Sequence, residues 1–167
     1  MIKAAIFDVD KTLLSHKGRC IPQSAVYAIE DLRKEDTLII LATGRPIYVL
    51  DEVKEAGVQY DYVVGCNGHC VYAKDELLDA SYFTFEQVER LTEFCVNHDY
   101  VLLWKYSDKN YVYHGGERMN EIHERLQINE PFINCETRDK HHSELPFGAV
   151  VYAPQKEVDR YVAEYDD

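Results

Sequence analysis

The sequence is poor in basic residues. Its 167 residues include 18 Lys and Arg against 30 Asp and Glu, which gives a formal net charge of −12. Phosphate backbones and anionic lipid surfaces are recognised by basic patches, so this balance argues against nucleic acid or a membrane as a partner. It leaves a small phosphorylated substrate open, because a bound cation inverts the local field.

Long apolar runs are also absent, although 46% of the residues are hydrophobic. No stretch could span a membrane, and two acidic residues interrupt the N-terminal apolar run, which therefore does not read as a signal peptide. The five cysteines are odd in number and irregularly spaced, and Cys66 and Cys70 lie too far apart for the common zinc pairing. We expect reduced thiols, solvated histidines at His141 and His142, and a cytoplasmic location.

The first twelve residues (MIKAAIFDVDKT) carry the strongest signal for function. A short apolar run predicts a strand buried on both faces, and Asp8 and Asp10 should project to the same side at its carboxyl end. Two close carboxylates raise each other's proton affinity, and a hard divalent cation offsets their repulsion. This favours phosphate chemistry, with Asp8 as nucleophile and Asp10 moving the proton. The Asp8 carboxylate and the Asp10 carbonyl oxygen suit Mg²⁺; the alternative is a turn or helix-capping role.

Two weaker signals follow later strands. Thr43-Gly44-Arg45 ends the apolar run at residues 37–42 (TLIILA), and the Thr43 hydroxyl with main-chain N–H groups suits a phosphate oxygen. Thr43 could instead only cap a helix. Arg45 could hold a phosphate or a carboxylate by a forked contact, or be solvated. Asn67 follows the run at residues 62–64 and could touch substrate, or only form a turn with Gly68.

The order of the predicted elements indicates a parallel α/β sheet followed by a second region. A polar loop at residues 15–19 leads to a helix opened by Ile21-Pro22, and another helix starts at Pro46 and ends at Gly57. A hairpin at residues 70–72 and 77–78, around Lys74-Asp75, follows. Beyond it we predict helices at 84–97, 116–126 and 155–165, an antiparallel pair at 100–106 and 111–114, and a strand at 147–153. We place the boundary so that residues 1–79 form one domain and 80–167 another.

The motifs FDVDKTLL, LATGR and VVGCNGHCVY resemble, in that order, the haloacid dehalogenase superfamily of phosphatases, and most closely its Cof-type branch. The resemblance implies an incomplete Rossmann-like parallel core with an inserted α/β cap domain at residues 80–167. It also implies Mg²⁺, a small phosphorylated metabolite, catalytic Asp8 and Asp10, and binding of phosphate or substrate by Thr12, Thr43, Gly44, Arg45 and Asn67.

The sequence departs from this family in two ways. Lys11 stands where glycine is more common, and the later lysine and the acidic GDxxND-like motif of the family do not occur. We therefore expect the strand bearing Asp8 to become an apolar edge open to self-association. The chain would then be a fragment, a truncated product with little activity, or one part of an assembly. A non-catalytic remnant that binds phosphate, metal or a partner is the main alternative. A metal-dependent sugar-nucleotide transferase and a phosphorelay receiver fit the motifs less well.

Overall fold

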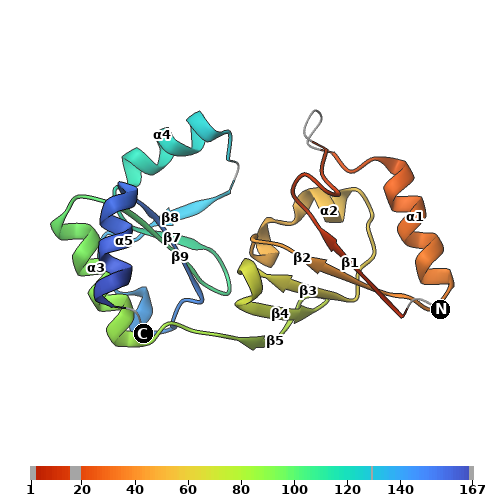
Figure 1. Cartoon of the computed structure of the whole chain (residues 1–167), viewed down its shortest axis with the longest axis horizontal. Coiled ribbons are helices and arrows are strands. Elements are labelled where there is room, and N and C mark those ends of the chain that lie inside the picture. Colours follow the sequence, from red (N-terminus) through yellow and green to blue (C-terminus); the bar gives the residue numbers. More distant parts are fainter. Residues whose placement is uncertain (1–2, 16–19, 129, 166–167) are drawn as a thin grey trace. The chain divides into compact units, whose positions relative to one another are not determined.

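The structure is a computed structural model that describes residues 3–15, 20–128 and 130–165 (Figure 1). The chain forms two compact units, Met1–Tyr82 and Phe83–Asp167, and each has its own sheet and its own core. None of the helices in the described ranges is long and apolar enough to cross a membrane. None of the five cysteines, all of which lie in these ranges, forms a disulfide.

The first unit is built on a five-stranded sheet in the order β1-β2-β3-β4-β5. The strands are β1 (Ala4–Asp8), β2 (Leu38–Ala42), β3 (Tyr62–Gly65), β4 (Cys70–Ala73) and β5 (Glu76–Ala80). The first three are parallel, and the predicted hairpin extends the same sheet with two antiparallel strands. The predicted α/β core with parallel strands is therefore confirmed.

The core of the first unit lies against the interior strand β2, which pairs with β1 and β3. Ile39 and Leu41 are fully buried, and the helix α1 (Gln23–Lys34) buries Val26 and Ile29. Strand β1, in contrast, lies at the edge, and Ile6 is 66% exposed. The expectation of burial on both faces is wrong for this strand, because the face that carries Ala4 and Ile6 is exposed. Among the described residues β2 alone pairs with β1, so the expected apolar edge is confirmed.

The second unit has a four-stranded sheet in the order β8-β7-β6-β9, formed by β6 (Val101–Lys105), β7 (Asn110–His114), β8 (Phe132–Asn134) and β9 (Gly148–Tyr152). Helix α3 (Phe85–Asn97) packs on one face through Val88 and Cys95, and α4 (Gly116–Leu126) packs on the other through Met119. Helix α5 (Gln155–Glu164) lies beside α3, where the rings of Tyr161 and Phe94 are 4.7 Å apart (Figure 1). Strand β6 is thus covered on both faces.

The helix predicted from Pro46 to Gly57 is broken in the structure. A 3₁₀ turn, η1 (Ile47–Val49), is followed by the short helix α2 (Asp51–Glu55). The guanidinium of Arg45 donates to the carbonyl of Val49 at 3.1 Å, and the N–H of Val53, which a continuous helix would direct to that carbonyl, donates to Leu50 instead. The apolar spacing predicted the buried face of this segment correctly, but it did not predict the break between η1 and α2.

Two further expectations need correction. His141 is buried rather than solvated, and with His142 it belongs to the 3₁₀ turn η3 (Lys140–His142). Strand β8 was not predicted, because three residues are too short to show an alternating pattern. Residues 16–19 of the predicted polar loop lie outside the described residues.

Candidate active site

The loops after β1, β2 and β3 all begin at the carboxyl ends of these parallel strands. We call this end of the sheet the carboxylate edge, to distinguish it from the outermost strand β1. In the parallel register Asp8 pairs with Ala42, and Ala42 pairs with Val64. Because parallel strands end on the same side, the residues that follow them lie in neighbouring loops, where ligands bind in open α/β sheets. The register therefore gathers the three predicted motifs at this edge.

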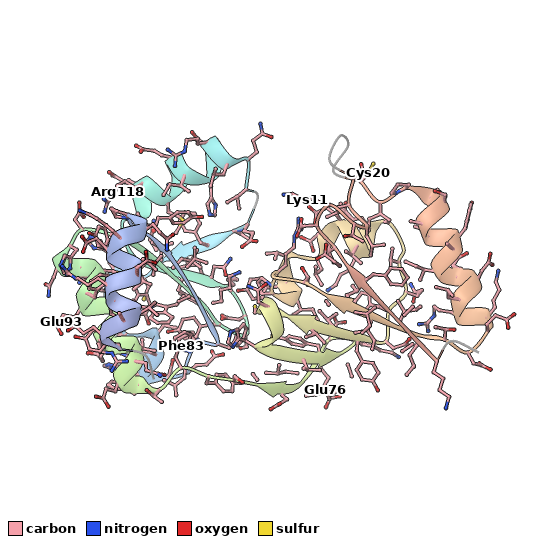
Figure 2. All side chains as sticks on the ribbon, in the orientation of Figure 1. Lys11, Cys20, Glu76, Phe83, Glu93 and Arg118 are labelled. Atoms are coloured by element: carbon pink, nitrogen blue, oxygen red, sulfur yellow. The ribbon has the colours of Figure 1, made fainter. Side chains whose placement is uncertain are left out.

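The loop after β1 folds back on the carboxylate of Asp8. The Thr12 hydroxyl donates to Asp8 Oδ2 at 2.9 Å, and the N–H of Leu13 donates to the Asp8 carbonyl at 3.3 Å. Lys11, in this loop, has φ 66°, a left-handed conformation that glycine adopts without strain (Figure 2). This geometry gives a physical reason why glycine is more common at this position in the family that the motifs resemble.

Arg45 holds the carboxylate of Asp10 in a forked contact. Its Nε donates to Asp10 Oδ2 at 2.9 Å, and its Nη2 donates to Asp10 Oδ1 at 2.7 Å. The Arg45 side chain is only 21% exposed, whereas that of Asp10 is 51% exposed. Of the alternatives that the sequence left open for Arg45, the structure shows the carboxylate clamp.

A second carboxylate, Glu52 of α2, also binds Arg45, and its Oε2 accepts from Nη1 at 3.0 Å. Burial lowers the pKa of Arg45, but the hydrogen bonds and charges of Asp10 and Glu52 outweigh it and raise the pKa above its ordinary value. Sequence reasoning missed Glu52. The available signal was an acidic residue in the first turn of a helix that starts close to a predicted site arginine.

Thr43, Gly44 and Asn67 form a tight contact between the loops after β2 and β3. The Thr43 hydroxyl accepts from the N–H of Arg45 at 3.1 Å, and the Thr43 carbonyl accepts from the N–H of Asn67 at 3.1 Å. A Cβ on Gly44 would lie 2.9 Å from Asn67 Oδ1, so only glycine fits there without displacing Asn67. The buried Thr43 is thus fixed by its own turn, and Asn67 lies against that turn.

The donor atoms at this edge suit a hard cation. The Asp8 carboxylate and the Asp10 main-chain carbonyl offer oxygen ligands, and Mg²⁺ is usually held by one or two carboxylates together with several waters. Asp10 and Glu52 both bind the guanidinium of Arg45, whereas the Asp8 carboxylate accepts from the neutral hydroxyl of Thr12, so the local charge is negative. A divalent cation fits both the chemistry and the charge of the site.

The sequence model of the haloacid dehalogenase-like hydrolases matches residues 5–167. Among solved structures, the chain is similar to BT1666 from Bacteroides thetaiotaomicron, a phosphatase of the haloalkanoate (HAD) enzyme superfamily, with 21% identity and a TM-score of 0.82 over 96% of this chain and 59% of that one. It is also similar to BT4131, a sugar phosphatase of HAD subclass IIB, with 21% identity and a TM-score of 0.78 over 96% of this chain and 62% of that one.

A hypothetical protein from Geobacillus kaustophilus HTA426 is likewise similar, with 22% identity and a TM-score of 0.84 over 99% of this chain and 63% of that one. No curated protein matches the sequence significantly. At these identities the similar structures establish the fold, and the chain spans about three fifths of their length.

Proposed function

We propose, from the premise that this chain belongs to the haloacid dehalogenase-like hydrolases, that the edge carrying Asp8 and Asp10 hydrolyses a small phosphorylated metabolite. One observation carries the proposal: Asp8, oriented by Thr12, and Asp10, clamped by Arg45, lie at the carboxyl end of β1, where the loops after β2 and β3 also begin. A nucleophile and a proton carrier held by separate partners suit a two-step displacement at phosphorus.

In the first step a carboxylate oxygen of Asp8 attacks phosphorus, and the bond to the leaving oxygen breaks. Asp10 delivers a proton to that oxygen, and the phosphoryl group remains on Asp8 as an acyl phosphate. In the second step Asp10 takes a proton from water, whose oxygen attacks the same phosphorus and returns Asp8 as a carboxylate. The products are the alcohol and inorganic phosphate, and Asp10 ends in its starting state.

Arg45 controls the availability of Asp10 in this scheme. Both oxygens of Asp10 accept from the guanidinium, so one must be released before the group can carry a proton. Glu52 and the Val49 carbonyl hold the other end of the guanidinium, which can therefore keep its place while the fork opens. We assign Arg45 as a positioning residue for Asp10.

The negative charge of the edge supports a role for Mg²⁺. A phosphate dianion would be repelled by the carboxylates of Asp8, Asp10 and Glu52, of which Arg45 binds the last two. Mg²⁺ bound through the Asp8 carboxylate and the Asp10 carbonyl would supply positive charge to the phosphoryl oxygens. The Thr43 hydroxyl and nearby main-chain N–H groups would contribute further hydrogen bonds to the phosphate.

We assign the second unit as a cap that selects the substrate. The support is its separate sheet and core, together with the similarity of nearly the whole chain to a protein described as a sugar phosphatase. A sugar phosphate is therefore the substrate class to test first. Domains at residues 1–79 and 80–167, with the second as the cap, remain our assignment.

The test is release of p-nitrophenol from p-nitrophenyl phosphate with and without Mg²⁺. We expect Mg²⁺-dependent turnover that Asp8→Asn abolishes and that Asp31→Asn, at an exposed carboxylate of α1, leaves unchanged. Circular dichroism of both variants checks that they are folded. Absence of turnover in the parent chain, or equal activity in Asp8→Asn, would contradict the proposal.

A non-catalytic module that binds phosphate is the second candidate. This function is favoured because Arg45 donates to both carboxylate oxygens of Asp10, which leaves neither oxygen ready to carry a proton. Calorimetry with Mg²⁺ and inorganic phosphate distinguishes the two functions. Binding that Asp8→Asn weakens, without turnover by the parent chain, supports the module, whereas turnover supports the enzyme.

A further inference from the structure

The second unit contains two histidines and a glutamate that converge from different elements. His141 and His142 belong to η3, and Glu89 lies on α3, 52 residues away from His141 in the sequence. One ligand atom from each residue lies within 4.8 Å of the other two. Glu89 and His142 are exposed to solvent, whereas the side chain of His141 is 1% exposed.

We propose that Glu89, His141 and His142 bind a zinc-like transition-metal ion. Two imidazoles and one carboxylate form a known three-ligand set for Zn²⁺, in which water completes the coordination. All three residues belong to the second unit, and the proposal holds whether or not the carboxylates of the first unit are catalytic. Imidazole ligands also separate the site chemically from the Mg²⁺ expected at those carboxylates, because Mg²⁺ prefers oxygen.

The present distances lie on either side of the separation that a tetrahedral ion needs. Ligands about 2.1 Å from zinc are separated by roughly 3.4 Å. His141 Nε2 and Glu89 Oε1 are 2.5 Å apart, and the three ligand atoms span at most 4.8 Å. An ion would take the place of the hydrogen that now lies between His141 Nε2 and Glu89 Oε1, because a ligating imidazole nitrogen carries no hydrogen. The rearrangement involves the exposed side chains of Glu89 and His142, and buried His141 can stay in place.

The environment of His141 orients its ring as a ligand. Its Nδ1 is 3.1 Å from the hydroxyl of Tyr113, which also accepts from the His141 main-chain N–H at 3.0 Å. The Tyr113 hydroxyl is in turn 2.8 Å from that of Tyr106. With Nε2 on a metal, Nδ1–H donates to Tyr113, and Tyr113 donates to Tyr106. Such an outer partner fixes the tautomer and the orientation of a ligating histidine.

Phe85 covers the two imidazoles on one side. Its ring centroid is 4.9 Å from that of His141 and 5.4 Å from that of His142, and the two imidazole rings are nearly perpendicular, at 82°. An apolar neighbour limits solvent access and strengthens the interaction between a cation and its ligands. A bound ion would therefore tie α3 to η3 beside the core of the second unit.

The test measures Zn²⁺ binding to the full chain by competition with a chromophoric chelator, in excess Mg²⁺. We expect one tight site that Glu89→Gln or His142→Gln weakens by more than about a hundredfold, beyond the ten- to hundredfold loss typical of an outer-shell change. Tyr113→Phe should fall within that smaller range. Glu86→Gln, on an exposed residue of α3, and His98→Gln, on an exposed residue just beyond it, are matched controls that should bind as the parent chain does.

Two further readouts keep the result independent of folding. Zn²⁺ should raise the melting temperature of the parent chain and of the controls by several degrees, and that of Glu89→Gln and His142→Gln by much less. Co²⁺ should give a spectrum without a thiolate charge-transfer band. Equal zinc affinity in all variants, or a thiolate band that assigns the metal to cysteines, would overturn the proposal.

Discussion

The clamp of Arg45 on Asp10 allows a quantitative test of how the candidate site is held together. Arg45→Met keeps the apolar length of the side chain but removes the fork to Asp10, the contact with Glu52 and the bond to the Val49 carbonyl. Exposed ion pairs contribute about 0.2–1 kcal/mol, whereas buried hydrogen bonds to charged groups contribute about 1.5–3 kcal/mol. Because Arg45 is mostly buried and Asp10 is half exposed, we expect the fork to contribute about 1 kcal/mol and the whole substitution to cost about 2 kcal/mol.

A double-mutant cycle isolates the fork. Arg45→Met, Asp10→Ala and their combination are unfolded in urea, and far-UV circular dichroism follows both units. The single tryptophan, Trp104, is buried in the second unit and reports that unit separately by fluorescence. The expected coupling free energy of about 1 kcal/mol should therefore be measured in the dichroism transition.

The matched control is the ion pair Lys34–Asp31, which has a similar distance of 2.8 Å but side chains that are 71% and 73% exposed. A cycle on this pair should give a clearly smaller coupling, because water and salt screen an ion pair on an exposed helix surface. If the Arg45–Asp10 coupling is no larger than the control, the guanidinium does not hold Asp10 in solution, and the positioning role that we assign to Arg45 fails.

Four other changes test separate parts of the molecule. Thr84→Ala removes the capping box of α3 and should cost about 1 kcal/mol in urea unfolding followed by Trp104 fluorescence. Burial raises the pKa of the Cys95 thiol from 9.0 to about 12. The contribution of this thiol to the free energy of unfolding is therefore complete below pH 9 and is lost as the pH rises from 9 to 12, because the unfolded chain releases the proton first. Urea titrations of the parent chain and of Cys95→Ala across this range should show the difference. Lys11→Gly relieves a left-handed backbone and should raise the free energy of unfolding by up to about 1 kcal/mol in urea. Ile6→Lys places a charge on the open edge of β1 and should reduce any self-association seen by ultracentrifugation.

Elements with a strong apolar period were predicted well from the sequence. Helix α4 has the predicted bounds, and α3 begins one residue after the predicted start because Thr84 is its N-cap. The hairpin of β4 and β5 was found from its turn at Lys74-Asp75, and Lys74 adopts the left-handed conformation that tight turns need. Local chemistry determines these elements, and local chemistry is visible in the sequence.

Features that depend on the polar contacts of particular side chains were not predictable in this way. The apolar spacing after Pro46 fits both a straight helix and an interrupted one, and it is the Arg45 side chain that takes the carbonyl needed for continuity. His141 stands in a polar stretch, and its burial arises from contacts with Tyr113 and Glu89, which come from other elements. In both cases the polar contacts of one side chain decided the outcome, and the apolar spacing carries no information on such contacts.

The turn after β3 shows how strained backbone can fix the candidate site. Cys66 and Asn67 are consecutive left-handed residues, with φ of 51° and 58°, and each such non-glycine conformation costs of order 1 kcal/mol. Their N–H groups donate to the loop after β2: that of Cys66 to the Arg45 carbonyl at 3.2 Å, and that of Asn67 to the Thr43 carbonyl at 3.1 Å. The unfavourable conformation is therefore retained where it fixes the backbone that carries Arg45. Through the fork of Arg45 the same turn restrains Asp10. Cys66 and Asn67, which have no acid–base role, therefore contribute to the position of the proton carrier.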